Sequence, residues 1–228
     1  MTVTDRTGTE GTGTEGTGTD ARSWTARLRG RVTGLVPPGQ ALPDRQPAYM
    51  TSAIYVFGVI TLAALVVVVA TGVVLSLGGA VWWHVSAAGH VVNSLHLWST
   101  EIFFAAMVVH LWGKFFMAAW RGKRALTWMT GVVAFVGSIG TAFTGYLSQT
   151  NFDSQWISTQ AKDGLNSVGI GAWMNVLNPA QMLMWHIVLM PLVVGVLVVW
   201  HVVLVRRHGV VPPIDAVEPV PAAEEGSR

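Results

Sequence analysis

Histidine supplies the candidate chemistry of this chain. Its 228 residues contain seven histidines and no cysteine, and four histidines lie inside long apolar stretches: His96, His110, His186 and His201. Ionisable side chains are costly in such surroundings and usually have a function. The lack of cysteine excludes a disulfide, a thiolate nucleophile, a cysteine-bound zinc or iron–sulfur cluster, and haem attachment through a CxxCH sequence. Any metal or cofactor must therefore be held by histidine, carboxylate, methionine or backbone.

The four histidines form two pairs with nearly the same spacing. His96 and His110 are 14 residues apart, and His186 and His201 are 15 residues apart. In an α-helix, 14 steps return to within about 40° of the starting direction and 15 steps to within about 60°, so each pair lies on one stripe. The members of a pair are separated by about 21–22 Å along the helix, most of a hydrocarbon core of about 30 Å.

Four apolar helices are expected to position these pairs. Hydrophobic residues make up 51% of the chain and charged residues only 11%, whereas about 25% charged residues is usual in soluble proteins. A helix needs about 20 apolar residues to cross a bilayer, and four stretches reach that length. We therefore predict an all-α fold, a transmembrane four-helix bundle, with spans near residues 53–77, 92–118, 127–148 and 180–206.

Basic residues predict the orientation of the bundle. Of the 14 Lys and Arg residues, 13 lie before the first span, at the link between the second and third or in the span end before it, or at and after the end of the fourth, and only Lys162 lies on the other side. The positive-inside rule then places both termini in the cytoplasm. We expect a multi-pass protein of a prokaryotic plasma membrane. The net charge of +2 is too small for a nucleic-acid-binding surface.

This topology makes the second and fourth spans parallel, so the histidines meet at two depths. His96 then faces His186 near the outer surface, and His110 faces His201 near the inner surface. Two histidines on opposite sides of one iron porphyrin make a six-coordinate haem, so two levels would hold two stacked haems in the bundle. Since no cysteine is present, these would be non-covalent, b-type haems. The alternative is four separate polar residues that hydrogen-bond to neighbouring helices.

Glycines on the first and third spans repeat the same period. Gly58 and Gly72 are 14 residues apart on the first span, and Gly131 and Gly145 are 14 apart on the third. A missing side chain lets a backbone lie flat against a porphyrin face, so we include the four glycines among the cofactor-binding residues. The alternative is ordinary packing of small residues between membrane helices.

Short sequences around these residues repeat a known pattern. They are His96-Leu-Trp-Ser-Thr, Arg124-Ala-Leu-Thr-Trp-Met-Thr-Gly131, Thr144-Gly145-Tyr146, and Pro191 with Arg206 and Gly209 around the fourth-span histidines. Together with the paired histidines and glycines, they make residues 45–213 resemble the N-terminal, four-helix part of the cytochrome b family, and its short b6 type in particular. The resemblance implies two b haems, one ligated by His96 and His186 and the other by His110 and His201.

The resemblance also implies a function and partners. It implies an electron-transfer subunit of a respiratory quinol-linked, bc-type oxidoreductase, which passes electrons between the two haems across the membrane and is not a self-sufficient enzyme. The implied partners are a Rieske iron–sulfur protein, a cytochrome c-type subunit and a separate C-terminal part of cytochrome b, with quinone or quinol and lipid. A homodimer is a further expectation. Two alternatives remain open: a haem-bearing anchor for another membrane dehydrogenase, and a haem-free scaffold with the same fold.

The chain departs from the family where arginines usually pair with haem propionates. Asn93 stands three residues before the first ligand histidine and Leu97 directly after it, and Gly113, followed by Lys114, stands three residues after the second. Gln149-Thr150 replaces the Pro-Trp that follows the third span and borders the outer quinol site. These departures imply altered reduction potentials or other propionate partners, and they motivate the haem-free alternative.

The segments outside the bundle differ in composition. Residues 1–44 include a Gly/Thr/Glu repeat, and residues 210–228 are rich in Pro, Ala and Glu, so both are predicted to be disordered tails of a membrane domain at 45–209. Apolar residues at helical spacing predict a short basic amphipathic helix at 24–36 on the membrane surface. Residues 152–177 are predicted to form one or two short helices on the outer surface.

Glu101 is the one acidic residue inside a predicted span. It lies about 140° around the helix from His96. This direction favours a contact with another helix or subunit over a role in proton transfer. His84 and His90 are expected in the solvated outer loop between the first two spans.

Overall fold

The structure contains helices joined by short links. A computed structural model describes residues 24–36 and 53–213 of the chain, and within them it has no strand, which confirms the all-α prediction. The helices in chain order are α1 (Trp24–Leu35), α3 (Ala53–Val85), α4 (Ala87–Phe116), the 3₁₀ turn η2 (Gly122–Arg124), α5 (Ala125–Leu147), α6 (Phe152–Ser167), α7 (Pro179–Met184), the π-helix η3 (Trp185–Leu189) and α8 (Met190–His208). Most of the predicted tails, and the predicted start of the membrane domain at residue 45, lie outside the described residues.

Four helical segments are long and apolar enough to cross a membrane, as predicted. They are α3, α4, η2 with α5, and the continuous rod of α7, η3 and α8 over Pro179–His208. In the most apolar 18-residue window of each segment, only 11–22% of the residues are buried inside the structure. Most apolar side chains therefore face outward. Lipid accepts such a surface, because a helix satisfies its own backbone hydrogen bonds.

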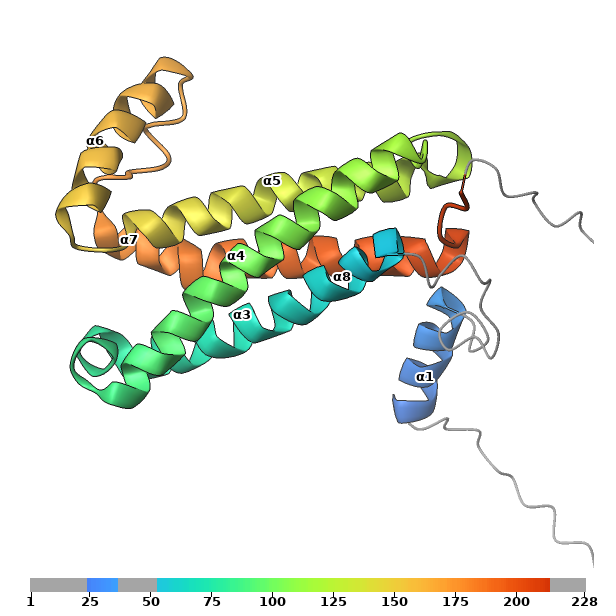
Figure 1. The fold of residues 1–228 in the computed structure, drawn as a ribbon, viewed down its shortest axis with the longest axis horizontal. Helices are drawn as coiled ribbons and strands as arrows, with labels where there is room; N and C mark the ends of the chain where they lie inside the picture. The colour runs from blue at the N-terminus through green and yellow to red at the C-terminus, as the bar shows by residue number, and fades with distance from the viewer. Residues whose placement is uncertain (1–23, 37–52, 214–228) are drawn as a thin grey trace, which may run out of the picture.

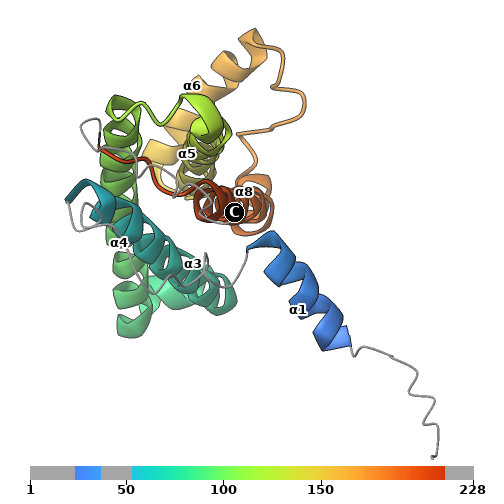
Figure 2. The same ribbon diagram turned by 90° about the vertical axis from the view of Figure 1, so that its right-hand side faces the viewer.

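The spans form two antiparallel helical pairs. The first pair is α3 with α4, and the second is α5 with the rod of α7, η3 and α8 (Figures 1 and 2). Within the first pair, Phe103 and Met107 of α4 pack against Ala64 of α3. The pairs meet where Phe104 of α4 contacts Phe135 of α5, with ring centroids 6.5 Å apart. Direct contact between the two helical pairs is thus limited, and histidines from both pairs lie between them.

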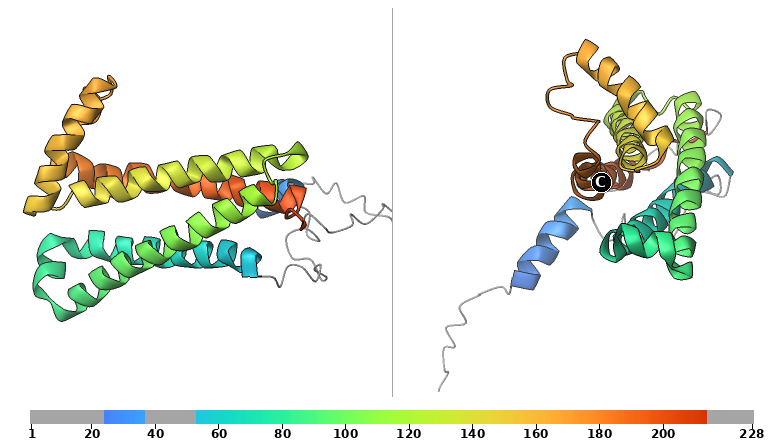
Figure 3. Two further views of the ribbon diagram at one scale, coloured as in Figure 1. Left: turned by 45° about the horizontal axis from the view of Figure 1, so that its top comes forward. Right: turned by 90° about the vertical axis from the view of Figure 1, so that its left-hand side faces the viewer.

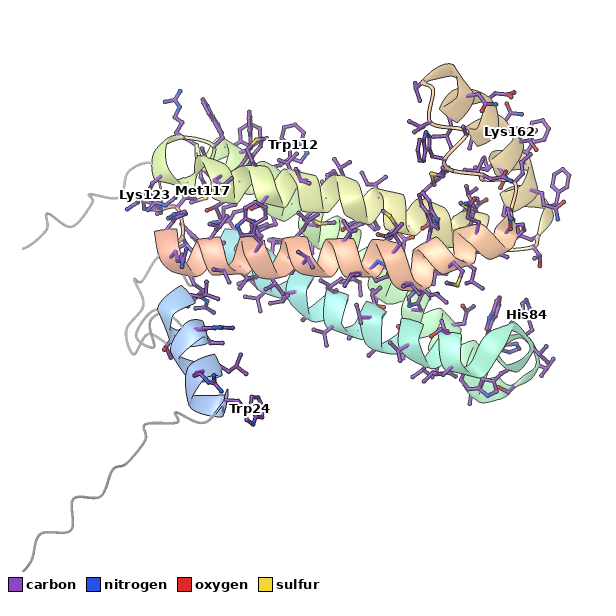
Figure 4. The ribbon with its side chains drawn as sticks, turned by 180° about the vertical axis from the view of Figure 1, so that it is seen from behind. Trp24, His84, Trp112, Met117, Lys123 and Lys162 are labelled. Carbon is purple, nitrogen blue, oxygen red and sulfur yellow. The ribbon has the colours of Figure 1, made fainter. Side chains whose placement is uncertain are left out.

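The two ends of the bundle carry different elements. The link between α3 and α4 lies at one end with α6, which projects away from the spans (Figure 3). The other end holds α1, the basic link between α4 and α5, and the end of α8 (Figure 1). Lys162 and His84 accordingly lie at the opposite end from Lys123 and Trp24 (Figure 4). This separation is the one that the distribution of basic residues predicts.

The helix ends differ from prediction where local backbone chemistry decides them. The first span was expected to end at residue 77, but α3 continues to Val85 across a kink at Gly79, whose φ of 76° only glycine adopts easily. The second span begins at Ala87, not at residue 92, because the Ser86 hydroxyl caps the helix by accepting a hydrogen bond from the Gly89 amide. Hence His84 and His90, expected in a loop, lie in helix ends, although both side chains are exposed.

The remaining short helices agree better with the sequence. The amphipathic helix expected at 24–36 is α1, and the helix expected on the outer side is α6 followed by turns. The rod begins at Pro179, directly after Asn178, whose side chain caps the helix by accepting a hydrogen bond from the Gln181 amide at 3.1 Å. Gly209, with a φ of 71°, follows its last helical residue. The location of α1 on a membrane surface stays a prediction.

Candidate functional site

The two histidines predicted near the outer surface, called the outer pair below, meet across the two halves of the bundle. His96 comes from α4 and His186 from η3, and their ring centroids are 6.2 Å apart with planes at 89°. An imidazole nitrogen binds a transition metal such as zinc at about 2 Å and lies about 1 Å from its ring centre, so two imidazoles on opposite sides of one metal ion have centres about 6 Å apart. The rings are therefore spaced as two axial ligands of one metal require.

The inner pair lies four turns further along the same helices. His110 is on α4 and His201 is on α8, and both side chains are partly buried. The spans supply no other histidine at this depth. The structure thus brings the four predicted histidines onto two helices of different pairs, at two levels.

Each histidine ring lies against one of the four predicted glycines. A Cβ atom built on Gly145 would lie 2.5 Å from Cε1 of His186, and one on Gly58 would lie 2.9 Å from Cε1 of His110. The corresponding distance is 3.0 Å from Gly131 to His201 and 3.2 Å from Gly72 to His96. We expected the glycines to face a porphyrin directly. In the structure the missing side chain admits the imidazole of the neighbouring helix, and contact of the glycines with a porphyrin stays a prediction.

Hydrogen bonds to Nδ1 fix the orientation of three rings. Nδ1 of His96 donates to Val68 O at 3.1 Å, and Nδ1 of His186 donates to Thr141 O at 2.9 Å. Nδ1 of His201 donates to Thr127 O at 2.9 Å. A carbonyl oxygen can only accept, so the proton must be on Nδ1 in each ring. The other nitrogen, Nε2, then keeps its lone pair for a metal ion, as second-shell partners of histidine ligands commonly ensure.

The three hydrogen bonds share one construction. Each acceptor carbonyl lies four residues before the glycine that the ring contacts, which is one helical turn. The pairs of acceptor and glycine are Val68 with Gly72, Thr127 with Gly131, and Thr141 with Gly145. The imidazole therefore reaches past a glycine and donates to the carbonyl one turn earlier.

A threonine precedes the glycine in each of these three positions. The hydroxyl of Thr71 lies 3.0 Å from Nδ1 of His96, and that of Thr130 lies 3.2 Å from Nδ1 of His201. Thr144 instead donates to Thr141 O at 2.9 Å, the same carbonyl that His186 uses. These threonines were not among the predicted site residues, although a Thr-Gly dipeptide recurs in the sequence at three of the four glycines and could have indicated them.

The fourth position differs. Phe57 stands where the other three have threonine, and Nδ1 of His110 is buried without a hydrogen-bond partner. By analogy with the other three positions, the acceptor would be the carbonyl of Ile54, which belongs to the first turn of α3. The four ligand positions are therefore not equivalent, and His110 is the least constrained.

A π-helical turn explains the unequal spacing of the two histidine pairs. His186 lies within the π-helix η3, which joins α7 to α8. The i→i+5 hydrogen bonds of a π-turn enclose one residue more than those of an α-helix. The turn absorbs the additional residue, so 15 residues in the rod correspond to 14 in α4. His186 and His201 are thereby aligned as closely as His96 and His110.

Unpartnered polar groups gather at the inner level. Among the described residues, three buried side-chain atoms lack a hydrogen-bond partner: Nδ1 of His110, Nε of Arg124 and Nε1 of Trp128. Lys114, one turn after His110, places its ammonium 3.6 Å from the centroid of the Tyr55 ring. Buried polar groups are almost always paired in proteins, so these donors suit a ligand with acidic groups.

The arrangement defines a class of protein. A membrane four-helix bundle with histidines at two levels, three of them oriented by backbone carbonyls so that Nε2 is free, is suited to hold haem. Comparison with known proteins identifies the family. The chain belongs to the cytochrome b (N-terminal)/b6/petB family, whose model matches residues 101–224. It is therefore an integral membrane protein of the cytochrome b type, and its membership implies haem binding and electron transfer.

Relatives support this assignment. The chain is 27% identical to cytochrome b6 of Heliobacterium mobile over 190 residues, which are 74% of this chain and 89% of that protein. It is 26% identical to cytochrome b6 of Chlamydomonas reinhardtii over 139 residues, covering 55% of this chain and 64% of that protein. A cytochrome bc complex cytochrome b subunit of Chlorobaculum thiosulfatiphilum is 28% identical over 137 residues, covering 55% of this chain and 32% of the subunit.

A solved structure has the same fold. A chain of a hyperthermophilic respiratory Complex III superposes with a TM-score of 0.62 at 21% sequence identity, covering 81% of this chain and 54% of that chain. The protein described here thus spans about half the length of that neighbour and a third to nine-tenths of the length of the three relatives above.

Proposed function

We propose that this protein is a dihaem electron-transfer subunit of a quinol-linked, bc-type oxidoreductase. One haem would take His96 and His186 as axial ligands, and the other would take His110 and His201. The observation that carries the proposal is the outer pair, with ring centroids 6.2 Å apart and both Nδ1 atoms donating to backbone carbonyls. Such rings present two free Nε2 atoms to one iron ion.

The residues of this chain would hold the cofactor and exclude water from it. Haem iron supplies a centre that accepts and releases one electron, and axial ligands and burial adjust its potential. The carbonyls of Val68, Thr141 and Thr127 keep three imidazoles in the ligating tautomer. The four glycines let the rings lie close to the neighbouring helix. Because the chain contains no cysteine, the haems would be held without covalent bonds.

Cationic and N–H donors at the inner level are candidates to bind haem propionates. The arginines expected from the family near the ligand histidines are replaced by Asn93, Leu97 and Gly113. The unpartnered Nε of Arg124 and Nε1 of Trp128, with Lys114 one turn after His110, supply donors in the same region. Binding a carboxylate there would satisfy groups that the protein alone leaves unpaired.

The relatives support a bc-type assembly. The named Chlorobaculum relative is a subunit of a cytochrome bc complex, and the structural neighbour belongs to a respiratory Complex III. We propose a Rieske iron–sulfur protein, a cytochrome c-type subunit and a separate C-terminal part of cytochrome b as partners, with quinone or quinol as the substrate of the assembly. Both termini would be cytoplasmic in a prokaryotic plasma membrane, since the basic residues cluster at that end of the bundle (Figure 4).

A haem count with a redox-titrated optical spectrum tests the proposal. The purified protein should contain two b-type haems per chain, and His186→Ala should reduce the count to one while leaving the inner haem. His110→Ala should remove the inner haem and keep the outer one. His84→Ala, which changes an exposed histidine outside the site, should keep both haems. A folded chain that holds no haem after production in haem-replete cells would contradict the proposal.

A further inference from the structure

Glu101 is a charged residue at the centre of a membrane span. It is the fifteenth of the 30 residues of α4 and lies between the levels of His96 and His110. The helices α3 and α5 and residues 179–205 contain no Asp, Glu, Lys or Arg. No hydrogen bond or ion pair joins Glu101 to another described residue, and its side chain is exposed. A charged group costs most at this depth of a bilayer.

The side of α4 that carries Glu101 is exposed and has no packed neighbour among the residues that the structure describes. Phe103 and Met107 pack toward α3, and Phe104 packs toward α5. The opposite side is exposed from end to end, and Trp112 on it points away from the bundle (Figure 4). We call this side the Glu101 face, and it consists of Leu97, Trp98, Glu101, Ala105, Val108 and Trp112.

We propose that the Glu101 face binds a transmembrane helix of another protein subunit, and that this helix places a hydrogen-bond donor (Lys, Arg, His, Asn or Gln) opposite Glu101. Intramembrane carboxylates are almost always turned toward other protein groups or water, and they pair with a donor there. Since no described residue of this chain places such a donor beside Glu101, we assign the donor to another subunit. The proposal does not depend on haem binding.

The composition of the face fits a helix better than lipid or a second copy of the chain. Ala105 lies one turn after Glu101, and a small residue there lets another backbone approach closely. Toward the outer end, a groove lined by His90, Val91, Ser94, Leu95 and Trp98 continues the surface. A symmetric contact between two copies would bring two Glu101 carboxylates together, which is unfavourable.

Site-specific photo-crosslinking in the native membrane tests the proposal. A photo-reactive amino acid at Ala105 should crosslink to a transmembrane segment of another subunit, with a Lys, Arg, His, Asn or Gln within one turn of the attachment point identified by mass spectrometry. The same amino acid at Val66, exposed on α3, is the matched control and should not give this product. Adducts with lipid alone, with a second copy of this chain, or with a segment that has no donor would each overturn the proposal.

A variant measures the contribution of the carboxylate. Glu101→Leu should weaken co-purification of the crosslinked subunit by roughly threefold to twentyfold, the range measured for hydrogen bonds between membrane helices. Val108→Ala, on the same face, should have a smaller effect. Unchanged co-purification with Glu101→Leu would overturn the proposal. The crosslinking experiment uses the protein without the Glu101 substitution, so it tests the proposal even if Glu101→Leu fails to fold. A haem-free protein would also give the crosslink.

Discussion

The contact between Gly145 and His186 gives the sharpest test of the site geometry. A Cβ atom at position 145 would lie 2.5 Å from Cε1 and 2.7 Å from Nδ1 of the ring, whereas carbon atoms in ordinary contact are about 3.5–4.0 Å apart. In Gly145→Ala the ring must therefore move by about 1 Å. This movement would also disturb the 2.9 Å hydrogen bond from Nδ1 to Thr141 O.

The expected magnitude follows from two opposing effects. Overpacking costs about 1–3 kcal/mol, and alanine regains up to about 1 kcal/mol because it is the better helix former. Subtracting about 1 kcal/mol from this cost leaves a net loss of up to about 2 kcal/mol, which corresponds to up to roughly thirtyfold weaker binding of the group that His186 would ligate. Haem per chain should fall toward one, with the inner haem kept.

Two further glycines provide matched comparisons. A Cβ atom on Gly72 would lie 3.2 Å from His96, so Gly72→Ala requires a shift of only a few tenths of an ångström and should retain more haem than Gly145→Ala. Gly195 has no atom within 4 Å, so Gly195→Ala should keep both haems and raise the unfolding temperature. Full haem retention by the Gly145 variant, equal to that of the Gly72 variant, would refute the reasoning.

Two other predictions concern the alignment and the electronic properties of the ligands. Deleting Val188 removes the additional residue from the π-turn and leaves a regular α-helix, so both haems should stay in place. Deleting Val193 takes a residue from the regular helix and keeps the π-turn, so it should rotate His186 by about 100° relative to His201 and remove the outer haem. Equal haem content in the two deletions would contradict this role of the π-turn. Thr71→Val removes a hydroxyl 3.0 Å from Nδ1 of His96, which weakens that imidazole as an electron donor and should raise the potential of the outer haem without changing the haem count. The Thr61 hydroxyl donates to Phe57 O and forms no hydrogen bond with a histidine among the described residues, so Thr61→Val is the control in the redox titration. Equal potentials in the two variants would argue against the effect.

The site could be predicted from the sequence because its elements are long and regular. Histidines and glycines that repeat at 14 or 15 residues in apolar segments identify faces of membrane helices, since helical periodicity is the same in every span. The match of the family model to residues 101–224 confirms the family for this part of the chain, and the ligand roles of the histidines stay predictions. His96 lies outside that match, and it was found from its spacing to His110.

Other features of the fold could not be predicted from the local sequence. The kink at Gly79 and the cap at Ser86 depend on backbone torsions and on one hydroxyl, which periodicity does not report. The role of the threonine before three of the glycines depends on tertiary contacts. Its hydroxyl lies beside His96 or His201, or donates to the carbonyl of Thr141.

The sequence by itself determined the number of spans, the depth of each histidine and the uneven distribution of basic residues, because each depends on hydrophobicity and position along the chain. The predicted topology already set His96 opposite His186, and only the tertiary structure decided how the four spans pack and how the rings lie. It paired α3 with α4 and α5 with α8, set the rings of His96 and His186 6.2 Å apart, and left Glu101 on an exposed face. These relations depend on side-chain packing between residues that lie far apart in the sequence, which a periodic pattern within one helix does not contain.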